Sequence, residues 1–234
     1  LQATFLAKPS DDKDPAVQIA RAEASKHFNR SEILQVNTSA VDMAFLKRNS
    51  PVLFDLFTPT GMETLRLVPV NFFAQGLIAT ELPSKKTIEI PYESLGIHYH
   101  GIVDGFEDSV AAISIHQGAV MGMVEKSDGL GIMVIGKMDN QDTHIVYYDK
   151  EFNMKSEFAC GSAHDKDDGD HHDAHDHSFV PDGAKFLTDD CVTVEFEIDI
   201  DIMEDYGGNF MNARSYVDAI FNQVTAIYSL ENIN

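Results

Sequence analysis

Turn-like residue pairs recur about every ten residues between positions 97 and 148, and this spacing restricts the fold more than any other feature of the chain. Short apolar segments lie between the pairs, which are Asp104-Gly105, Gln117-Gly118, Asp128-Gly129 and Asp139-Asn140. Connections this short join neighbouring antiparallel strands, because a parallel crossover needs about a dozen residues or more. The sequence therefore predicts an antiparallel meander with strands at 97–103, 110–116, 119–124, 130–137 and 143–148.

Two more strands and two helices are predicted upstream of the meander. Residues 52–57 and 64–70 flank a hairpin-like connection, and a loop rich in Pro and Lys is expected before residue 97. Asp14-Pro15 is a cap and first-turn pair for a helix, a short strand is expected at 33–36, and Ser39 is expected to cap a brief helix. The predicted fold class is mainly β (α+β), an antiparallel β-rich unit from about residue 52 with N-terminal helices.

The composition changes abruptly at residues 164–177. Five His and six Asp fill this tract, with one Lys, one Gly and one Ala between them. Such a segment cannot build a core, so residues 161–190 are interpreted as a solvated acidic linker. The same side chains could bind Zn²⁺, Ca²⁺ or another divalent cation, and the candidate ligands are His164, Asp167, Asp170, His171, His172, His175 and His177.

Beyond the linker, the pattern predicts a strand followed by a helix. Residues 192–202 alternate between apolar and polar side chains, which is typical of a strand with one buried face. The helix carries an apolar stripe made of Val217, Ile220, Phe221, Val224, Ile227 and Tyr228. A lone strand and helix cannot bury these faces, so they must pack on the β-rich unit or on residues outside this sequence.

The charge of the chain excludes some partners. Lys and Arg number 17 against 38 Asp and Glu, which gives a net charge of −21. Because this charge repels phosphate groups, nucleic acid is not expected as a partner. No apolar run approaches the ~18 residues of a membrane-spanning helix, so no membrane span is expected.

Known catalytic motifs are missing from the sequence, and one cysteine is the main candidate for chemistry. No His is followed by Glu, so there is no H-E-x-x-H helix to hold zinc. His98 and His100 share a strand face but lack a third ligand, and we interpret them as ordinary strand residues. Cys160 is a candidate zinc ligand, because a thiolate can occupy the open position of a catalytic zinc. The alternatives are a structural thiol or a disulfide with Cys191.

Residues 191–199 and 212–234 resemble the opening of the catalytic domain in reprolysin (adamalysin-like) zinc metalloproteases. In that family an apolar strand ending in Asp leads through a Tyr-containing turn to a helix like that at 216–224. Upstream, residues 98–103 resemble the Y-x-G-x-V strand of reprolysin prodomains, and residues 109–114 resemble their S-x-A-A-L-S strand. Cys160-Gly161 stands where that family has its cysteine switch.

The resemblance implies a zymogen with three parts. Residues 1–160 would be an inhibitory, folding-assisting prodomain, 161–190 the linker, and 191–234 the first strand and helix of the catalytic domain. Cys160 would ligate the active-site zinc of the full-length parent, and this chain itself would hold no catalytic residue. The implied partners are the remainder of its own catalytic domain and the protein substrates of the parent, at a secreted or cell-surface location.

Two other functions agree with the same residues. One is a non-catalytic secreted β-rich binding or assembly module with a cation-binding acidic tract. The other is a dedicated metal-binding protein centred on residues 164–177. An H-E-x-x-H-x-x-G-x-x-H sequence downstream of Asn234 would favour the zymogen over the module, and metal titration of a tract-deleted variant would test the third function.

Overall fold

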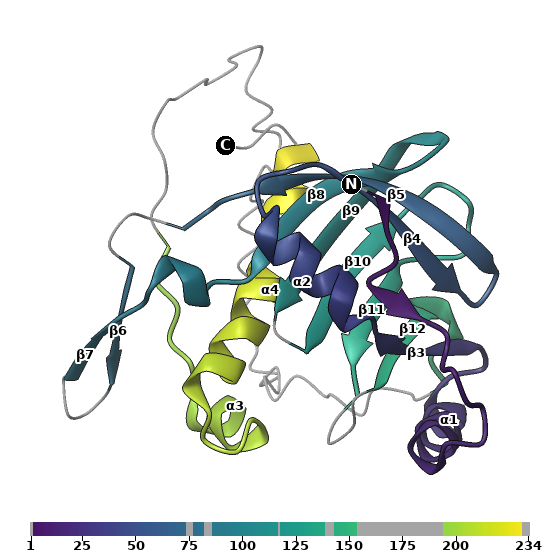
Figure 1. The fold of residues 1–234 in the computed structure, drawn as a ribbon, viewed down its shortest axis with the longest axis horizontal. Helices are drawn as coiled ribbons and strands as arrows, with labels where there is room; N and C mark the ends of the chain where they lie inside the picture. Colours follow the sequence, from purple (N-terminus) through teal and green to yellow (C-terminus); the bar gives the residue numbers. More distant parts are fainter. Residues whose placement is uncertain are drawn as a thin grey trace, which may run out of the picture.

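The structure is a computed structural model that describes residues 2–73, 77–81, 86–116, 118–138, 143–153 and 194–230. Within these residues ten strands form one curled sheet, and two further strands form a separate hairpin (Figure 1). The strands of the sheet are β1 (Gln2–Ala3), β2 (Leu6–Ala7), β3 (Ser31–Val36), β4 (Val52–Thr58), β5 (Gly61–Val70), β8 (Ile97–Val103), β9 (Phe106–His116), β10 (Ala119–Glu125), β11 (Met133–Lys137) and β12 (Thr143–Tyr148). The other elements are the hairpin strands β6 (Ile78–Glu81) and β7 (Lys86–Glu89) and the α-helices α1 (Pro15–His27), α2 (Thr38–Leu46), α3 (Ile200–Asp205) and α4 (Phe210–Leu230).

The N-terminus joins the two edges of the curled sheet. The strand order is β1-β4-β5-β8-β9-β10-β11-β12-β3-β2. β1 pairs in parallel with β4, where Ala3 faces Phe54, and β2 pairs antiparallel with β3, where Leu6 faces Val36. Because β1 and β2 are close together in the chain, one short segment covers both edges. Covered edges protect the sheet from pairing with other chains.

The predicted meander is confirmed. β8 to β12 follow one another as antiparallel neighbours, and the β4–β5 hairpin closes where Thr58 faces Gly61. Gly101 lets β8 approach β5 closely, since a Cβ at this position would lie 1.9 Å from the carbonyl oxygen of Arg66. The fold is therefore mainly β with a few helices, as predicted.

The interior of the curled sheet is the main apolar core. Tyr99, Phe5 and Phe54 are fully buried there, and the Phe5 and Phe54 rings pack 4.9 Å apart. Val41 and Ala44 of α2 belong to the same cluster. Burial of one large apolar side chain stabilises a protein by ~1.5–3 kcal/mol, so this interior dominates the stability of the fold.

The first helix forms as predicted and packs outside the sheet. The Asp14 carboxylate accepts a hydrogen bond from the Ala16 N–H at 2.9 Å, and Pro15 begins α1. The apolar side of α1 covers the outer face of β3 and β12 through a second cluster, which contains Val17, Ala20, Ala24, Ile33 and Ile145.

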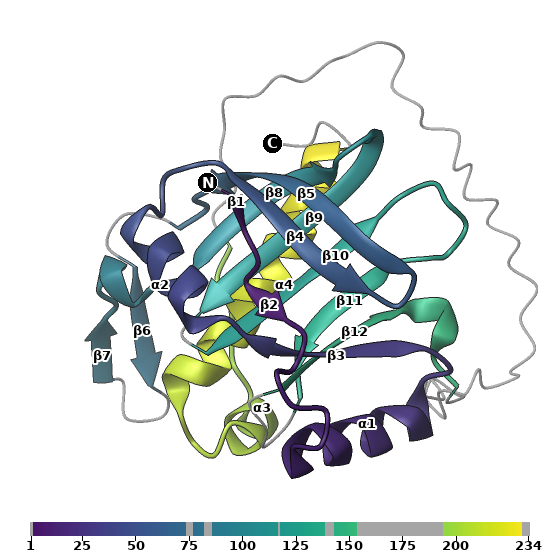
Figure 2. The ribbon, with the colours of Figure 1, turned by 45° about the vertical axis from the view of Figure 1, so that its right-hand side comes forward.

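The second helix begins two residues earlier than predicted, and its cap is different. Asn37, not Ser39, caps α2, and its side-chain oxygen accepts from the Ala40 N–H at 3.2 Å. Asn37 directly follows β3, so the chain turns into the helix as soon as the strand ends. Figures 1 and 2 show α2 lying across the sheet on the side opposite α4.

The β6–β7 hairpin was not predicted, because its segment resembled a loop rich in Pro and Lys. In the structure it projects away from the curled sheet (Figure 1). Ile78 and Ile88 lie on it and are both exposed to solvent.

The strand predicted at 192–202 is wrong over its described part. Residues 194–199 form no strand, and residues 200–205 form the helix α3. The Asp199 carboxylate caps this helix by accepting from the Ile200 N–H at 2.6 Å. An alternating pattern produces a strand only where another strand pairs with it, and the described residues offer 194–199 no such partner.

The last helix packs on the outer face of β8, β9 and β10, behind the sheet in Figure 1. The predicted helix that carries the stripe from Val217 to Tyr228 is thus confirmed. The predicted linker, 161–190, lies outside the described residues, and the division of the chain into three parts stays a prediction. No helix among the described residues is long and apolar enough to cross a membrane.

Candidate functional site

The residues predicted to bind zinc or other cations all lie outside the described part of the chain. They are Cys160, His164, Asp167, Asp170, His171, His172, His175 and His177. The same is true of Cys191, so the cysteine-switch role and the rival disulfide both stay predictions. In the part that is described, no group of three or more His, Cys, Asp or Glu side chains could hold a metal ion.

The contact between α4 and the sheet contains the densest group of buried polar residues in the described chain. Strand pairing places His98 of β8 opposite Ser114 of β9, and both side chains point outward, under α4. The helix meets this face with small residues and one amide: Ala213, Ala219, Asn222 and Ala226 are the α4 positions with 0–2% exposure. Small side chains let the helix backbone approach the strands closely.

Asn222 connects α4 to both strands beneath it. Its Nδ2 donates to the Ile113 carbonyl at 3.2 Å and to Ser114 Oγ at 3.1 Å. The Asn222 carbonyl is 3.1 Å from His100 Nε2, which places both predicted strand histidines in hydrogen bonds of this interface. Asn222 is fully buried, and no described residue offers its Oδ1 a hydrogen bond.

Two histidines pack against each other in this contact. The rings of His98 and His116 lie 5.4 Å apart, edge to face, and Phe72 and Phe73 cover His98 from the other side. Burial, followed by the charges of His116 and Arg214, lowers the pKa of His98 to about 2. Burial and the charge of Arg214 lower the pKa of His116 to about 4. Both imidazoles are therefore neutral at neutral pH, and the Nε2 atom of each is buried and has no hydrogen-bond partner within the described segments.

An ion pair on α4 borders the two histidines. Arg214 and Asp218 lie one helical turn apart with 2.8 Å between Nη2 and Oδ2, and the Arg214 guanidinium lies 5.6 Å from the Phe73 ring centre. Burial raises the pKa of Asp218 to about 6, although the charge of Arg214 acts in the opposite direction. The pair is mostly buried, so its charges act on the histidines with little screening by water.

The distance between Ser114 and His98 alone would suit a nucleophile and its base. Ser114 Oγ lies 2.9 Å from His98 Nδ1. However, Ser114 is fully buried and also accepts from Asn222, so no substrate carbonyl could reach its hydroxyl. The arrangement connects the sheet to α4 and does not form a catalytic pair.

The face of α4 that points away from the sheet carries large apolar residues. Tyr216, Ile220 and Ile227 are 36%, 43% and 41% exposed, and Tyr228 is more exposed still. The predicted apolar stripe of this helix is therefore only partly buried, since Ile220, Ile227 and Tyr228 face solvent while alanines and Asn222 face the sheet. α4 thus has two different contact faces.

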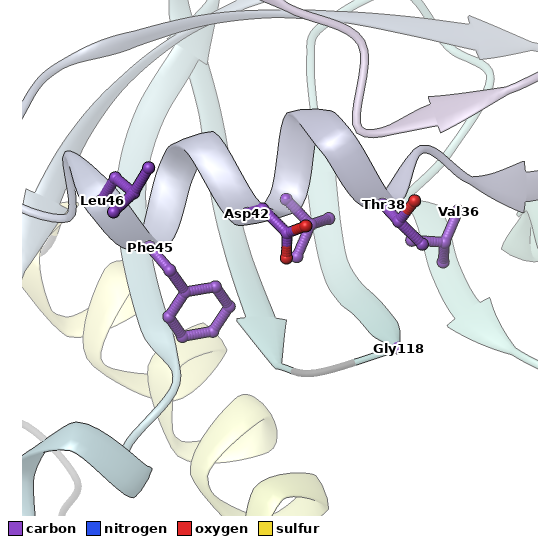
Figure 3. Close-up of a pocket in the computed structure, with 7 residues that line it drawn as sticks. Val36, Thr38, Asp42, Phe45, Leu46 and Gly118 are labelled. Carbon is purple, nitrogen blue, oxygen red and sulfur yellow. The ribbon is translucent and has the colours of Figure 1, made fainter.

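A groove of about 600 Å³ lies beside α2 (Figure 3). Its lining comes from the end of β3, from α2 and from the β9–β10 turn, and consists of Val36, Thr38, Val41, Asp42, Phe45, Leu46 and Gly118. One carboxylate and one hydroxyl accompany the apolar side chains. Such a lining can hold an apolar segment but provides no acid–base pair.

A second polar group links β5 to the β10–β11 connection. Lys126 Nζ lies 2.6 Å from Glu63 Oε1 and 2.9 Å from Asp128 Oδ2, and Tyr148 Oη donates weakly to Glu63 at 3.4 Å. The ammonium also lies 5.0 Å from the Phe106 ring centre. These contacts connect neighbouring parts of the curled sheet, and we assign them a structural role.

Most residues of the α4 contact were not singled out from the sequence. His98 and His100 were, but His116, Ser114 and Asn222 were not. Two signals can be named. Gly96 leaves space for the His116 ring, since a Cβ there would lie 2.4 Å from His116 Cε1. Asn222 stands three residues after Ala219 and four before Ala226, on the small-residue side of the helix.

No protein-family model matches the chain, and a search of curated proteins finds no match either.

Proposed function

We propose that this chain is the N-terminal part of the zymogen of a reprolysin-type zinc metalloendopeptidase, secreted or exposed at the cell surface. The curled sheet would be the inhibitory and folding-assisting prodomain, and the segment that contains α3 and α4 would open the catalytic domain. The observation that carries the proposal is the different character of the two faces of α4.

One face of α4 contacts the sheet, and the other carries exposed apolar residues among the described part of the chain. Alanines and Asn222 face the strands, while Ile220 and Ile227 face solvent and Tyr216 packs against Tyr206 of the α3–α4 connection. A helix with apolar residues on opposite sides is normally buried on both. The remainder of a catalytic domain, covering the outer face, would place α4 between that domain and the prodomain. This is the position expected for the first helix of a peptidase held by its prodomain.

Cys160 is the residue of this chain that the proposal assigns to the active-site zinc. Thiolate is a strong zinc ligand and would occupy the position that a catalytic zinc keeps for water. The other zinc ligands would come from residues outside this sequence, because none of its histidines precedes Glu. No catalytic step is therefore assigned to this chain, and protein substrates belong to the parent enzyme.

The natural polypeptide provides the first test. Intact mass and sequencing should find residues after Asn234 that include H-E-x-x-H, and the present chain, added in trans, should inhibit the peptidase freed of its prodomain. A natural polypeptide without a zinc-binding motif would contradict the proposal and leave the binding-module function.

Cys160 provides the second test, with Cys191 as its matched control. In the full zymogen Cys160→Ala should raise latent peptidase activity, and Cys191→Ala should leave it low. A disulfide between these residues would close a thirty-residue loop and stabilise the fold by roughly 3–4 kcal/mol, so it is a serious rival. If Cys160→Ala stays as inactive as the parent, or if mapping finds this bond in the zymogen, the switch role is lost.

The second candidate function is a non-catalytic binding or assembly module. The observation in its favour is the groove beside α2, whose apolar lining includes Phe45 and the exposed Leu46 (Figure 3). An apolar peptide segment would suit this lining. Retained inhibition in trans by a Phe45→Ala variant would separate the groove from the prodomain function.

A further inference from the structure

The contact between α4 and the sheet places ionisable rings where apolar side chains would give stronger packing. His98 and His116 are 2% and 6% exposed. The titratable and charged groups around them come from every neighbouring element: His100 on β8, Arg214 and Asp218 on α4, and Arg48 after α2. Of these groups only Asp218 is anionic, and it is already paired with Arg214. A proton added to either imidazole would therefore find no free carboxylate beside it.

The same contact is weakly held. Three buried polar atoms in it have no hydrogen-bond partner among the residues that the structure describes, namely His98 Nε2, His116 Nε2 and Asn222 Oδ1. Each atom loses its hydrogen bond to water when the helix docks, which opposes docking. The apolar part of the contact comes from alanines, which bury little apolar area, and from Phe221, whose ring lies 5.3 Å from that of Phe72. A cavity of about 100 Å³ adjoins His98 and brings space for water close to its ring.

We propose that α4 is an acid-released helix, and that protonation of His98 and His116 detaches it from β8–β10 while the curled sheet stays folded. The inference concerns contacts among the described residues only and does not rest on the peptidase proposal.

The direction of the pH effect follows from the proton balance. A released helix exposes both histidines, which then titrate near 6.5, whereas docking lowers the pKa of His98 to about 2 and of His116 to about 4. Between pH 6.5 and the lowered pKa values, the released form binds more protons than the docked form. Docking is therefore strongest above pH 6.5 and weakens as the pH falls. Asp218 acts in the opposite direction, because docking raises its pKa to about 6. The proton uptake of two histidines on release exceeds that of one carboxylate on docking. The net effect is release of α4 in acid.

The curled sheet depends less on these residues. Its interior cluster contains large apolar side chains, and neither His98 nor His116 belongs to it. His144 is the buried histidine on the inner side, and burial, followed by the charge of Lys137, lowers its pKa to about 4. A test between pH 7.5 and pH 5 is therefore suitable, because the large apolar core should keep the sheet folded across that range.

Amide hydrogen exchange of the full chain, corrected for intrinsic exchange rates, measures both parts at once. From pH 7.5 to pH 5 we expect protection of the α4 amides to fall roughly 10- to 100-fold and, at pH 5, to lie well below that of the β11 and β12 amides. Unchanged α4 protection, or α4 protection equal to that of β11 and β12 at pH 5, would overturn the proposal.

The double variant His98→Asn/His116→Asn removes both titrations, and His144→Asn is the matched control for a buried histidine away from α4. The double variant should show α4 protection that no longer falls in acid, and the control should retain the fall. A double variant with the full acid response would also overturn the proposal. If the double variant fails to dock α4 at pH 7.5, the comparison of α4 with β11 and β12 in the unmodified chain decides the matter.

Discussion

The two faces of the curled sheet are packed in opposite ways. On the inside, large rings such as Phe5 and Phe54 contact each other, and the N-terminal segment joins both sheet edges. On the outside, under α4, alanines meet histidines, and several buried polar atoms have no hydrogen-bond partner in the described part of the chain. Close apolar packing suits a permanent core, whereas a small, polar contact suits an element that can leave. The comparison indicates that the sheet and α4 are separate units of stability.

The largest effect should come from the inside. Phe54→Ala removes a fully buried ring and should lower the free energy of unfolding by about 3–5 kcal/mol, because a cavity remains. Leu53→Ala is the control, since Leu53 precedes it on the same strand and is 41% exposed. Urea denaturation measures both. Equal losses for the two variants would show that the interior is not the dominant core.

A substitution at His144 tests how acid changes the stability of the sheet interior. His144 Nε2 accepts from the Val120 N–H at 3.0 Å and the pKa of His144 is lowered to about 4, so the folded sheet binds fewer protons than the unfolded chain. Stability should fall as the pH drops from about 6.5 toward 4, by at most about 1.4 kcal/mol per pH unit.

The difference between the unmodified chain and His144→Gln isolates this residue from the other histidines. Urea unfolding at several pH values should show a shallower pH dependence in the variant, which can still accept a hydrogen bond but does not titrate. Identical slopes in both proteins would mean that His144 is not buried in its neutral form.

A substitution in the contact between α4 and the sheet should have a smaller effect. Asn222→Ala removes the donor to Ile113 and Ser114 and should weaken α4 docking by about 1–3 kcal/mol. Exchange protection of α4 should fall and should lie well below that of β11 and β12. Gln223→Ala, at the next position, should have little effect, because its amide donates to Ala219 of the same helix. Equal protection of α4 and of β11 and β12 in the Asn222→Ala variant would show that they open as one unit.

The sequence predicted those parts of the fold that depend on neighbouring residues. The meander follows from local turns, and α1 follows from Asp14 and Pro15, which act within a single helical turn. The pairing of β1 and β2 with distant strands could not be predicted, because two-residue strands have no pattern of their own. The alternation at 192–202 predicted a strand incorrectly, since that pattern depends on a partner strand that residues 194–199 lack.

The site was less predictable than the fold for the same physical reason. His98 and His100 stood out because they flank Tyr99 on one strand. Ser114 and His116 come into contact with them only through the register of β8 and β9. Asn222 joins them only because α4 docks through its alanines, while its apolar stripe suggested that the larger residues would be buried. The candidate ligands from Cys160 to His177 lie outside the described residues and stay predictions.

The smallest expected effect distinguishes the two faces of α4 directly. Ile220→Gln and Ala219→Gln place the same side chain at adjacent helix positions, so the new residue has the same helix propensity in both variants. Ile220 is 43% exposed, and its replacement should change α4 protection by less than about 0.5 kcal/mol. Ala219 is 1% exposed against the sheet, and its replacement should cost about 1–3 kcal/mol through overpacking. Hydrogen exchange at pH 7.5 measures both variants.

If Ile220→Gln proves as harmful as Ala219→Gln, the outer face of α4 is already covered in this chain, and the argument that it awaits a catalytic domain fails. If it is harmless here but harmful in a longer natural polypeptide, that face is where the second domain packs.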